Sequence, residues 1–265
     1  MPFTFAHPAA AVPLRGPLGR YAVLSALVIG SLAPDFSYFL PFRVTRVQSH
    51  SLFGLFWFCM PAGVIAYALF HGLLARPLVD LLPHAARVGC EQILATRLRP
   101  TASAVLVSLF AGAVTHIAWD AFTHAGAPIV RVSRTLRLHL WTVSGYPISV
   151  YTILQHLSTV LGLVLLVVWI RAWLRTAPPG GAEPIAAPRP FRRSLAWMAI
   201  AAATLALWLA SGTLGPPREP TLRGVQLLMR RVVPAGIESL AVAVTAYAIV
   251  WRAAFRGMLP RAGGS

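Results

Sequence analysis

Residues 102–122 read ASAVLVSLFAGAVTHIAWDAF and combine the two features on which the interpretation of this chain depends. The stretch contains no arginine, and it is long enough to cross the hydrocarbon core of a membrane, which takes about 20 mainly apolar residues in an α-helix. Near its end it carries His116 and Asp120. Ionisable side chains are costly inside a membrane and are usually functional there. The stretch therefore predicts a spanning helix that carries a polar site.

Five further apolar runs predict five more spanning helices, over residues 21–42, 52–75, 151–174, 194–214 and 233–255. The composition agrees, because 57% of the 265 residues are hydrophobic and only 11% are charged. An ordinary soluble domain carries about 25% charged residues. We expect an all-α, polytopic membrane protein with about six transmembrane helices.

The basic residues are all arginines, and they give the chain a formal net charge of +16. They lie between the apolar runs and do not form one continuous basic face. Such arginines set the topology of a membrane protein and contact anionic lipid headgroups. Membrane lipids are therefore the expected partners, and nucleic acid is not.

A connection over residues 175–193 divides the chain into two portions. Its middle, TAPPGGAEPIAAPRP, has the composition of a flexible linker. The portion over residues 1–174 has four predicted helices and contains every histidine, whereas the two-helix portion over residues 194–265 contains none. Histidine chemistry is expected in the first portion, and packing or an interaction surface in the second.

Helix polarity directs several histidines and aspartates to one end of the first portion. In an antiparallel arrangement, the end of each helix lies beside the start of the next, and residues four apart share a helical face. The residues that converge in this way are Asp35, His50, His116, Asp120, His124 and His156. Mixed imidazole and carboxylate ligands suit zinc, manganese or iron better than magnesium or calcium. A single histidine of this kind more often hydrogen-bonds a neighbouring helix, but six groups at one end favour a metal site.

His7 reaches the same end only if the N-terminus folds back into the protein. Residues 8–14 are apolar, and Arg15-Gly16-Pro17 is typical of a turn. The sequence therefore predicts a short N-terminal re-entrant helix that begins at the site, which a membrane tolerates where protein buries it.

Five motifs, in this order, resemble a bacterial family of multi-spanning membrane proteins known only as a domain of unknown function. They are MPFTFAHPAA (1–10), SALVIGSLAPDFSYF (25–39), SHSLFG (49–54), THIAWDAFTHAG (115–126) and GYPISVYTILQHLSTVLG (145–162). The resemblance implies a multi-pass protein of the bacterial inner membrane.

The order of the motifs is also similar, more loosely, to that of the membrane-bound metal-dependent hydrolases of bacterial inner membranes. The matching positions are His7, Pro34-Asp35, Ser49-His50-Ser51, His116, Asp120, Thr123 and Gly126. The chain departs from that pattern at Phe36 and Ser37, where those hydrolases have Asp-His, and it lacks their His-Arg before the Thr-His-Ser motif. The resemblance therefore implies a metal site with fewer ligands than theirs.

These observations predict a metal-dependent hydrolase acting on a lipid or lipid-linked ester or phosphoester at the membrane face. A bound metal ion would activate water, and Asp120 or Asp35 would orient a ligand or act as the general base. Headgroup contacts could come from Arg43, Arg46, Arg131, Arg134 and Arg137, although interfacial anchoring explains these arginines as well. The alternative is a non-catalytic membrane protein in which the same residues form a structural metal site or a polar packing site.

Overall fold

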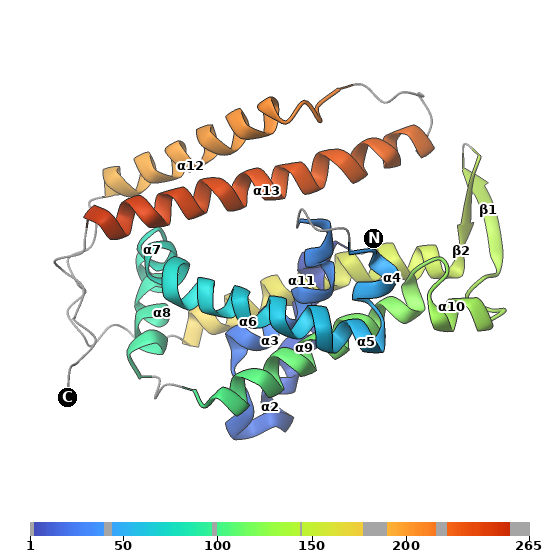
Figure 1. Ribbon diagram of the computed structural model, residues 1–265, viewed down its shortest axis with the longest axis horizontal. Coiled ribbons are helices and arrows are strands. Elements are labelled where there is room, and N and C mark those ends of the chain that lie inside the picture. Colours follow the sequence, from blue (N-terminus) through green and yellow to red (C-terminus); the bar gives the residue numbers. More distant parts are fainter. Residues whose placement is uncertain are drawn as a thin grey trace. The chain divides into compact units, whose positions relative to one another are not determined.

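The computed structural model describes residues 3–39, 44–96, 100–143, 145–176, 190–215 and 222–254. These residues are mostly helical, which confirms the predicted all-α class (Figure 1). Five helices within them are long and apolar enough to cross a membrane: Leu52–Asp80, Ala102–Val132, Val150–Thr176, Phe191–Ala210 and Leu227–Ala254. Most of the predicted linker lies outside the described residues.

The first predicted span, over residues 21–42, is built differently from the other five. In the structure it consists of the short helix α3 (Leu24–Leu32) followed by the 3₁₀ helix η4 (Ala33–Tyr38). Pro34 has no backbone N–H to donate and therefore cannot extend the α-helical hydrogen-bond ladder. As a result Asp35 lies in the first turn of η4.

The described chain separates into two compact units, each with its own packing. The first comprises residues 1–67, 97–176 and 219–226, and the second comprises residues 68–96, 177–218 and 227–265. Two helical stretches contain a boundary between these ranges along the chain. The first is Leu52–Asp80, which contains α5 (Leu52–Gly54), α6 (Met60–Leu69) and α7 (Ala75–Asp80), and the second is α13 (Leu222–Ala254).

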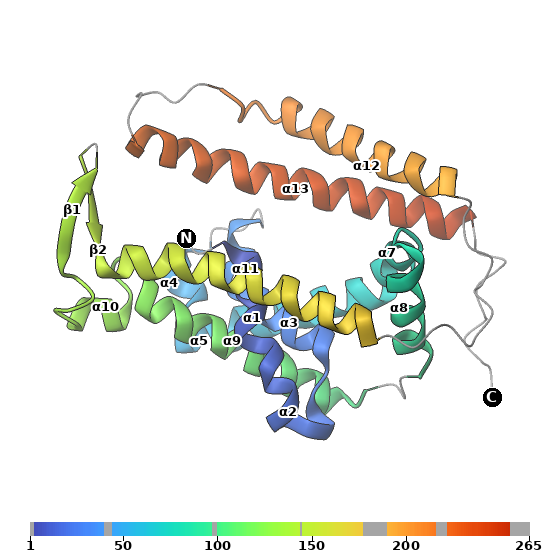
Figure 2. The same cartoon turned by 180° about the vertical axis from the view of Figure 1, so that it is seen from behind.

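The centre of the first unit is the contact between α3 and α9 (Ala102–Thr123), which run side by side (Figures 1 and 2). Gly30 lies against the backbone of Leu109, and Gly112 lies against the backbone of Leu27. Small residues at such a contact let two helix backbones approach closely, as is common in membrane proteins. Ser108 strengthens the contact, because its hydroxyl accepts from Val23 N (2.8 Å) and donates to Tyr21 O (2.8 Å).

Short helices fold the N-terminal segment onto this pair. They are η1 (Thr4–Ala6), α1 (Pro8–Ala11), η2 (Val12–Leu14), α2 (Arg15–Leu18) and η3 (Gly19–Tyr21). Both α3 and α9 contact α1, as does α11 (Val150–Thr176). The segment therefore begins inside the unit with short helices, in agreement with the prediction made from His7.

The link between α9 and α11 contains structure that the sequence analysis did not predict. Helix α10 (Pro128–Val132) is followed by a hairpin of β1 (His139–Val143) and β2 (Tyr146–Ser149), which pair antiparallel. Gly145, between the two strands, has a φ of 78°, a conformation that glycine adopts without strain.

The second unit packs α12 (Pro190–Ala210) and α13 with α7 (Ala75–Asp80) and α8 (His84–Thr96). Leu81, Ile200 and Ala243 form its buried apolar cluster. Trp251 Nε1 donates to Asp80 Oδ2 (2.7 Å), and Arg87 pairs with Glu91 (2.7 Å).

Candidate metal centre

Two capped turns hold His50 at the site. The preceding helix, α4 (Arg46–Ser49), begins with a capping box in which Thr45 and Gln48 satisfy each other's backbone N–H groups. The following helix, α5 (Leu52–Gly54), is capped by the Ser51 side chain, which accepts from Gly54 N (2.8 Å). His50 lies in the tight connection between the two helices.

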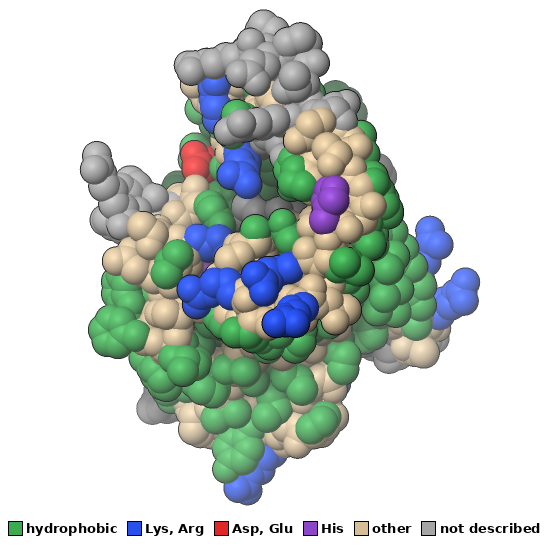
Figure 3. All heavy atoms as spheres, turned by 90° about the vertical axis from the view of Figure 1, so that its right-hand side faces the viewer, with side chains coloured by type: hydrophobic (Ala, Val, Ile, Leu, Met, Phe, Trp, Pro, Cys, Tyr) green, Lys and Arg blue, Asp and Glu red, His purple; other side chains and the backbone are tan. Residues whose placement is uncertain are grey.

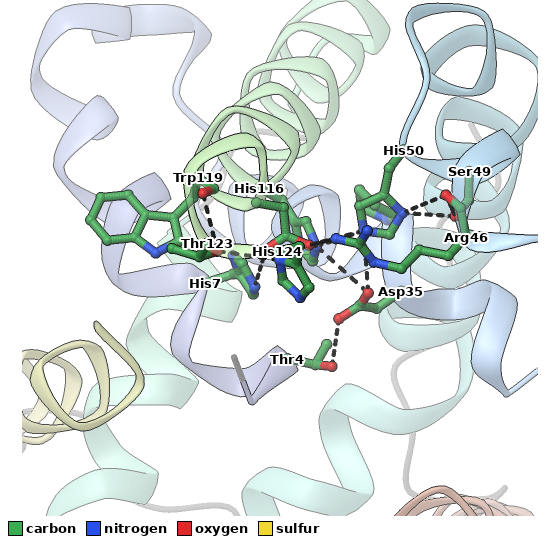
Figure 4. Close-up of polar contacts among 12 residues, drawn as sticks. Thr4, His7, Asp35, Arg46, Ser49, His50, His116, Trp119, Thr123 and His124 are labelled. Carbon is green, nitrogen blue, oxygen red and sulfur yellow. Dashed lines mark hydrogen bonds and ion pairs between the residues drawn. The ribbon is translucent and has the colours of Figure 1, made fainter. Parts of the chain in front are cut away.

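Helix α9 supplies His116 and Asp120 from one face, one turn apart. Both residues are buried, at 0% and 4% exposure respectively. The close approach of α3 brings η4 and its Asp35, which is 2% exposed, to the same place. Figure 4 shows Asp35, His50 and His116 pointing toward one another from three separate segments.

Four ligand atoms from these segments lie within 4.8 Å of one another: Asp35 Oδ1, His50 Nε2, His116 Nε2 and Asp120 Oδ2. His50 Nε2 is 3.2 Å from His116 Nε2, 3.4 Å from Asp35 Oδ1 and 3.2 Å from Asp120 Oδ2. His116 Nε2 is 3.6 Å from Asp35 Oδ1 and 3.5 Å from Asp120 Oδ2. The predicted convergence of these four residues is therefore confirmed.

Hydrogen bonds on the far side of each imidazole orient the His116 and His50 rings so that each Nε2 faces the cluster. His116 Nδ1 is 2.7 Å from Ser31 O, and His50 Nδ1 is 3.1 Å from Arg46 O. A carbonyl oxygen only accepts, so His116 Nδ1 carries the hydrogen, and in the neutral ring His116 Nε2 presents a lone pair. His50 Nδ1 also lies 2.9 Å from Ser49 Oγ, a hydroxyl that can donate or accept, so both tautomers of His50 fit its contacts. Metal-ligating histidines are commonly oriented by this kind of bond.

The spacing of the four atoms fits a cation at their centre. The lone pair of His116 Nε2 and the two carboxylates favour positive charge between them, and Arg46 supplies part of that charge at Asp120 Oδ2. Tetrahedral zinc with bonds of about 2.0–2.2 Å places its ligand atoms about 3.4 Å apart. The five separations given above, 3.2–3.6 Å, match this value. The residues therefore fit a divalent metal ion.

His7 and His124 lie beside the other carboxylate oxygen of Asp120. His7 Nε2 is 3.6 Å and His124 Nδ1 is 3.3 Å from Asp120 Oδ1. The His7 ring stacks on His116, with centroids 3.6 Å apart. Both His7 Nε2 and Asp120 Oδ1 are buried without a hydrogen-bond partner. Burial lowers the pKa of His7 to about 3, so its ring is neutral near pH 7.

Two polar side chains support the carboxylates. Thr4 Oγ1 donates to Asp35 Oδ2 (2.6 Å), and an Arg46 guanidinium nitrogen donates to Asp120 Oδ2 (2.7 Å). The Arg46 side chain is 27% exposed, whereas that of Asp120 is 5% exposed. Arg46 therefore connects the buried cluster with the surface.

The structure does not bring every predicted residue into the cluster. His156 is exposed on α11, because the buried face of that turn is formed by Thr152 and Gln155. None of the hydrogen bonds or ion pairs that the structure gives for the described residues joins His156 to the site. Arg43 lies outside the described residues. The other three histidines, His71, His84 and His139, lie in η6 (Phe70–Leu74), α8 and β1.

Sequence reasoning missed the contacts of Thr4, Ser31 and Arg46 with the cluster. A signal existed for Thr4, because it lies three residues before His7 and residues with that spacing share a face of a helical turn. Arg46 had been considered only as a headgroup contact. Ser31 acts through its backbone carbonyl, which a side-chain pattern does not reveal.

The fold and site together define a class: a multi-spanning helical protein with a buried cluster of histidine and aspartate side chains. The chain belongs to the family described as a domain of unknown function, DUF4184, whose model matches residues 1–249. Comparisons with curated proteins and with solved structures find no match.

Proposed function

We propose that this protein is a metal-dependent hydrolase of the bacterial inner membrane that acts on a lipid or lipid-linked ester or phosphoester. The observation that carries the proposal is the buried group of Asp35, His50, His116 and Asp120, which offers four ligand atoms within 4.8 Å of one another. Zinc, manganese and iron suit these ligands. When bound, such an ion supplies Lewis acidity and lowers the pKa of a water molecule.

The two carboxylates have different surroundings, which favours different roles. Asp35 Oδ2 accepts a hydrogen bond from Thr4, which fixes the orientation of this carboxylate and suits it to be a metal ligand. Asp120 Oδ1 is buried without a hydrogen-bond partner and faces His7 and His124. An oxygen in this position can accept a proton from an attacking water molecule, which makes Asp120 the better candidate for the general base.

Arg46 at the cluster and three exposed arginines in the segment after α9 supply positive charge for an anionic substrate. Arg131, Arg134 and Arg137 are exposed in α10 and the segment before β1, and Arg46 contacts Asp120. Figure 3 views the molecule from the side on which the hairpin lies in Figure 1, and several arginine side chains lie close together there. Guanidinium groups bind phosphate oxygens in a bidentate manner, so this charge supports a phosphoester or another anionic lipid as substrate.

A structural metal site is the second candidate, and one observation favours it. Four protein ligands complete a tetrahedral shell, as in closed structural zinc sites. Hydrolysis with the same four ligands needs a larger coordination number, as manganese or iron adopt, or the release of one carboxylate. Asp120 is the carboxylate suited to release, because Arg46 already neutralises it.

Turnover assays on metal-loaded protein in detergent separate the two functions. We expect hydrolysis of a fluorescent lipid phosphoester or ester by the wild type and by His71→Ala, and none by His116→Ala or Asp120→Asn. His71 is a matched control because it lies in η6, outside the cluster. A wild type that binds metal but cleaves no substrate in a panel of lipid esters and phosphoesters would refute the hydrolase and favour the structural site.

A further inference from the structure

An apolar cleft adjoins the metal centre through His7. It has a volume of about 150 Å³ and lies within the first unit, between α1, α9 and α11. Its walls are Ala6, Ala9, Ala10, Trp119, Ser158, Leu161, Gly162 and Leu165, with His7 among them. The same His7 ring stacks on His116, so this side chain contacts both the cleft and the cluster.

Glycine at position 162 is needed for this arrangement. A Cβ at Gly162 would lie 3.0 Å from Ala6 O and 3.2 Å from Ala6 Cβ. The absent side chain lets the N-terminal segment pack directly on α11 (Figure 2). The cleft is a recess beside this contact.

The surface around the cleft indicates what fills it. Leu161 and Leu165 are 54% and 50% exposed, and their neighbours Leu157, Val160, Val164 and Val168 are exposed as well. Because α11 is long and apolar enough to span a membrane, we expect lipid chains to contact this surface. A cleft of about 150 Å³ has room for a benzene-sized hydrocarbon group. A stretch of an alkyl chain is therefore the fitting occupant.

The cluster lies between this cleft and Arg46. Asp120 Oδ1 faces His7, which lines the cleft, and Asp120 Oδ2 faces Arg46, which reaches the surface. We propose that the cleft binds the hydrocarbon chain of an anionic amphiphile whose polar group lies at the metal centre beside Arg46. This inference rests on the proposed function, and it defines the substrate class as a lipid cleaved between its anionic headgroup and its chain.

Photo-labelling tests the inference without requiring turnover. The probe is a phosphatidic acid with a diazirine in one acyl chain, mixed with the full-length protein in nanodiscs, irradiated and mapped by mass spectrometry. We expect at least about fivefold more label on Leu161 and Leu165 than on Val168, which lies further along the same exposed surface. Equal labelling of all three residues would show only surrounding lipid and would overturn the proposal.

Variants make the test specific. Ala10→Phe and Ser158→Leu each fill the cleft, so cleft labelling should fall to the level of Val168 while metal content stays at that of the wild type. Val168→Phe adds bulk to α11 outside the cleft and should change nothing. If neither filling variant lowers the labelling, the cleft is not the binding site.

A comparison of probes with different headgroups tests whether the bound lipid must be anionic. A phosphatidylcholine probe with the same chain should label the cleft several-fold less, and Arg46→Gln should remove the difference between the two probes. Equal labelling by both probes in the wild type would overturn selection for an anionic headgroup. Cleft labelling in a protein that binds no metal would refute the proposed function and leave the chain-binding site standing.

Discussion

Replacing Gly112 by alanine should separate the two helices that assemble the site. A Cβ at Gly112 would overlap Leu27 O and Ser31 N on α3. Both are backbone atoms, so no side-chain rotation can relieve the overlap, and the helices must move apart. Overpacking typically costs about 1–3 kcal/mol, and we expect the upper end of that range here. The shift would also stretch the hydrogen bond from His116 Nδ1 to Ser31 O.

Thermal unfolding in detergent measures this effect. For a chain of this size, about 3 kcal/mol corresponds to a fall of roughly 6–12 °C in Tm. Gly72→Ala is the matched control, because nothing lies within 4 Å of a Cβ at that position and alanine favours helix. A Gly112→Ala protein as stable as Gly72→Ala would refute the close packing of α3 on α9.

Three other variants test separate parts of the structure. Thr4→Val removes the hydrogen bond to Asp35 and should weaken metal binding about 10–100-fold in a titration, as loss of an orienting partner typically does; unchanged affinity would deny Thr4 that role. His156→Ala should leave metal content at the wild-type level, and a loss of metal would return His156 to the ligand set. Trp251→Phe removes a hydrogen bond to Asp80 in the second unit and should cost about 1 kcal/mol in unfolding free energy, with metal content unchanged; a loss of metal would mean that this hydrogen bond supports the metal centre as well.

The long apolar runs made the helices predictable from the sequence. Five of the six predicted spans correspond to long helices in the structure, because uninterrupted apolar segments of that length have few alternatives to a helix. The run over 21–42 was apolar enough but contains Pro34, whose missing N–H ends α3 and starts η4. The hairpin of β1 and β2 follows an arginine-rich stretch with no strong alternating pattern, and this left it unpredicted.

The core of the site was predictable because helix polarity and a four-residue spacing act over short distances along the chain. Asp35, His50, His116 and Asp120 could be assigned to one end of the helices before their contacts were known. His156 shows the limit of that reasoning, since end-to-end position does not say which way a side chain points around its helix. The position of His156 along α11 therefore did not predict that its side chain is exposed.

The metal content of the purified protein, determined by elemental analysis, decides whether Asp35, His50, His116 and Asp120 form a metal centre. We predict about one equivalent of zinc, manganese or iron in the wild type and in His71→Ala, and less than about a tenth of that in His50→Ala and His116→Ala, because each removes a ligand from a four-ligand shell. A folded wild type that binds none of these metals, even after incubation with each, would contradict the metal centre. Equal metal content in all four proteins would contradict it as well.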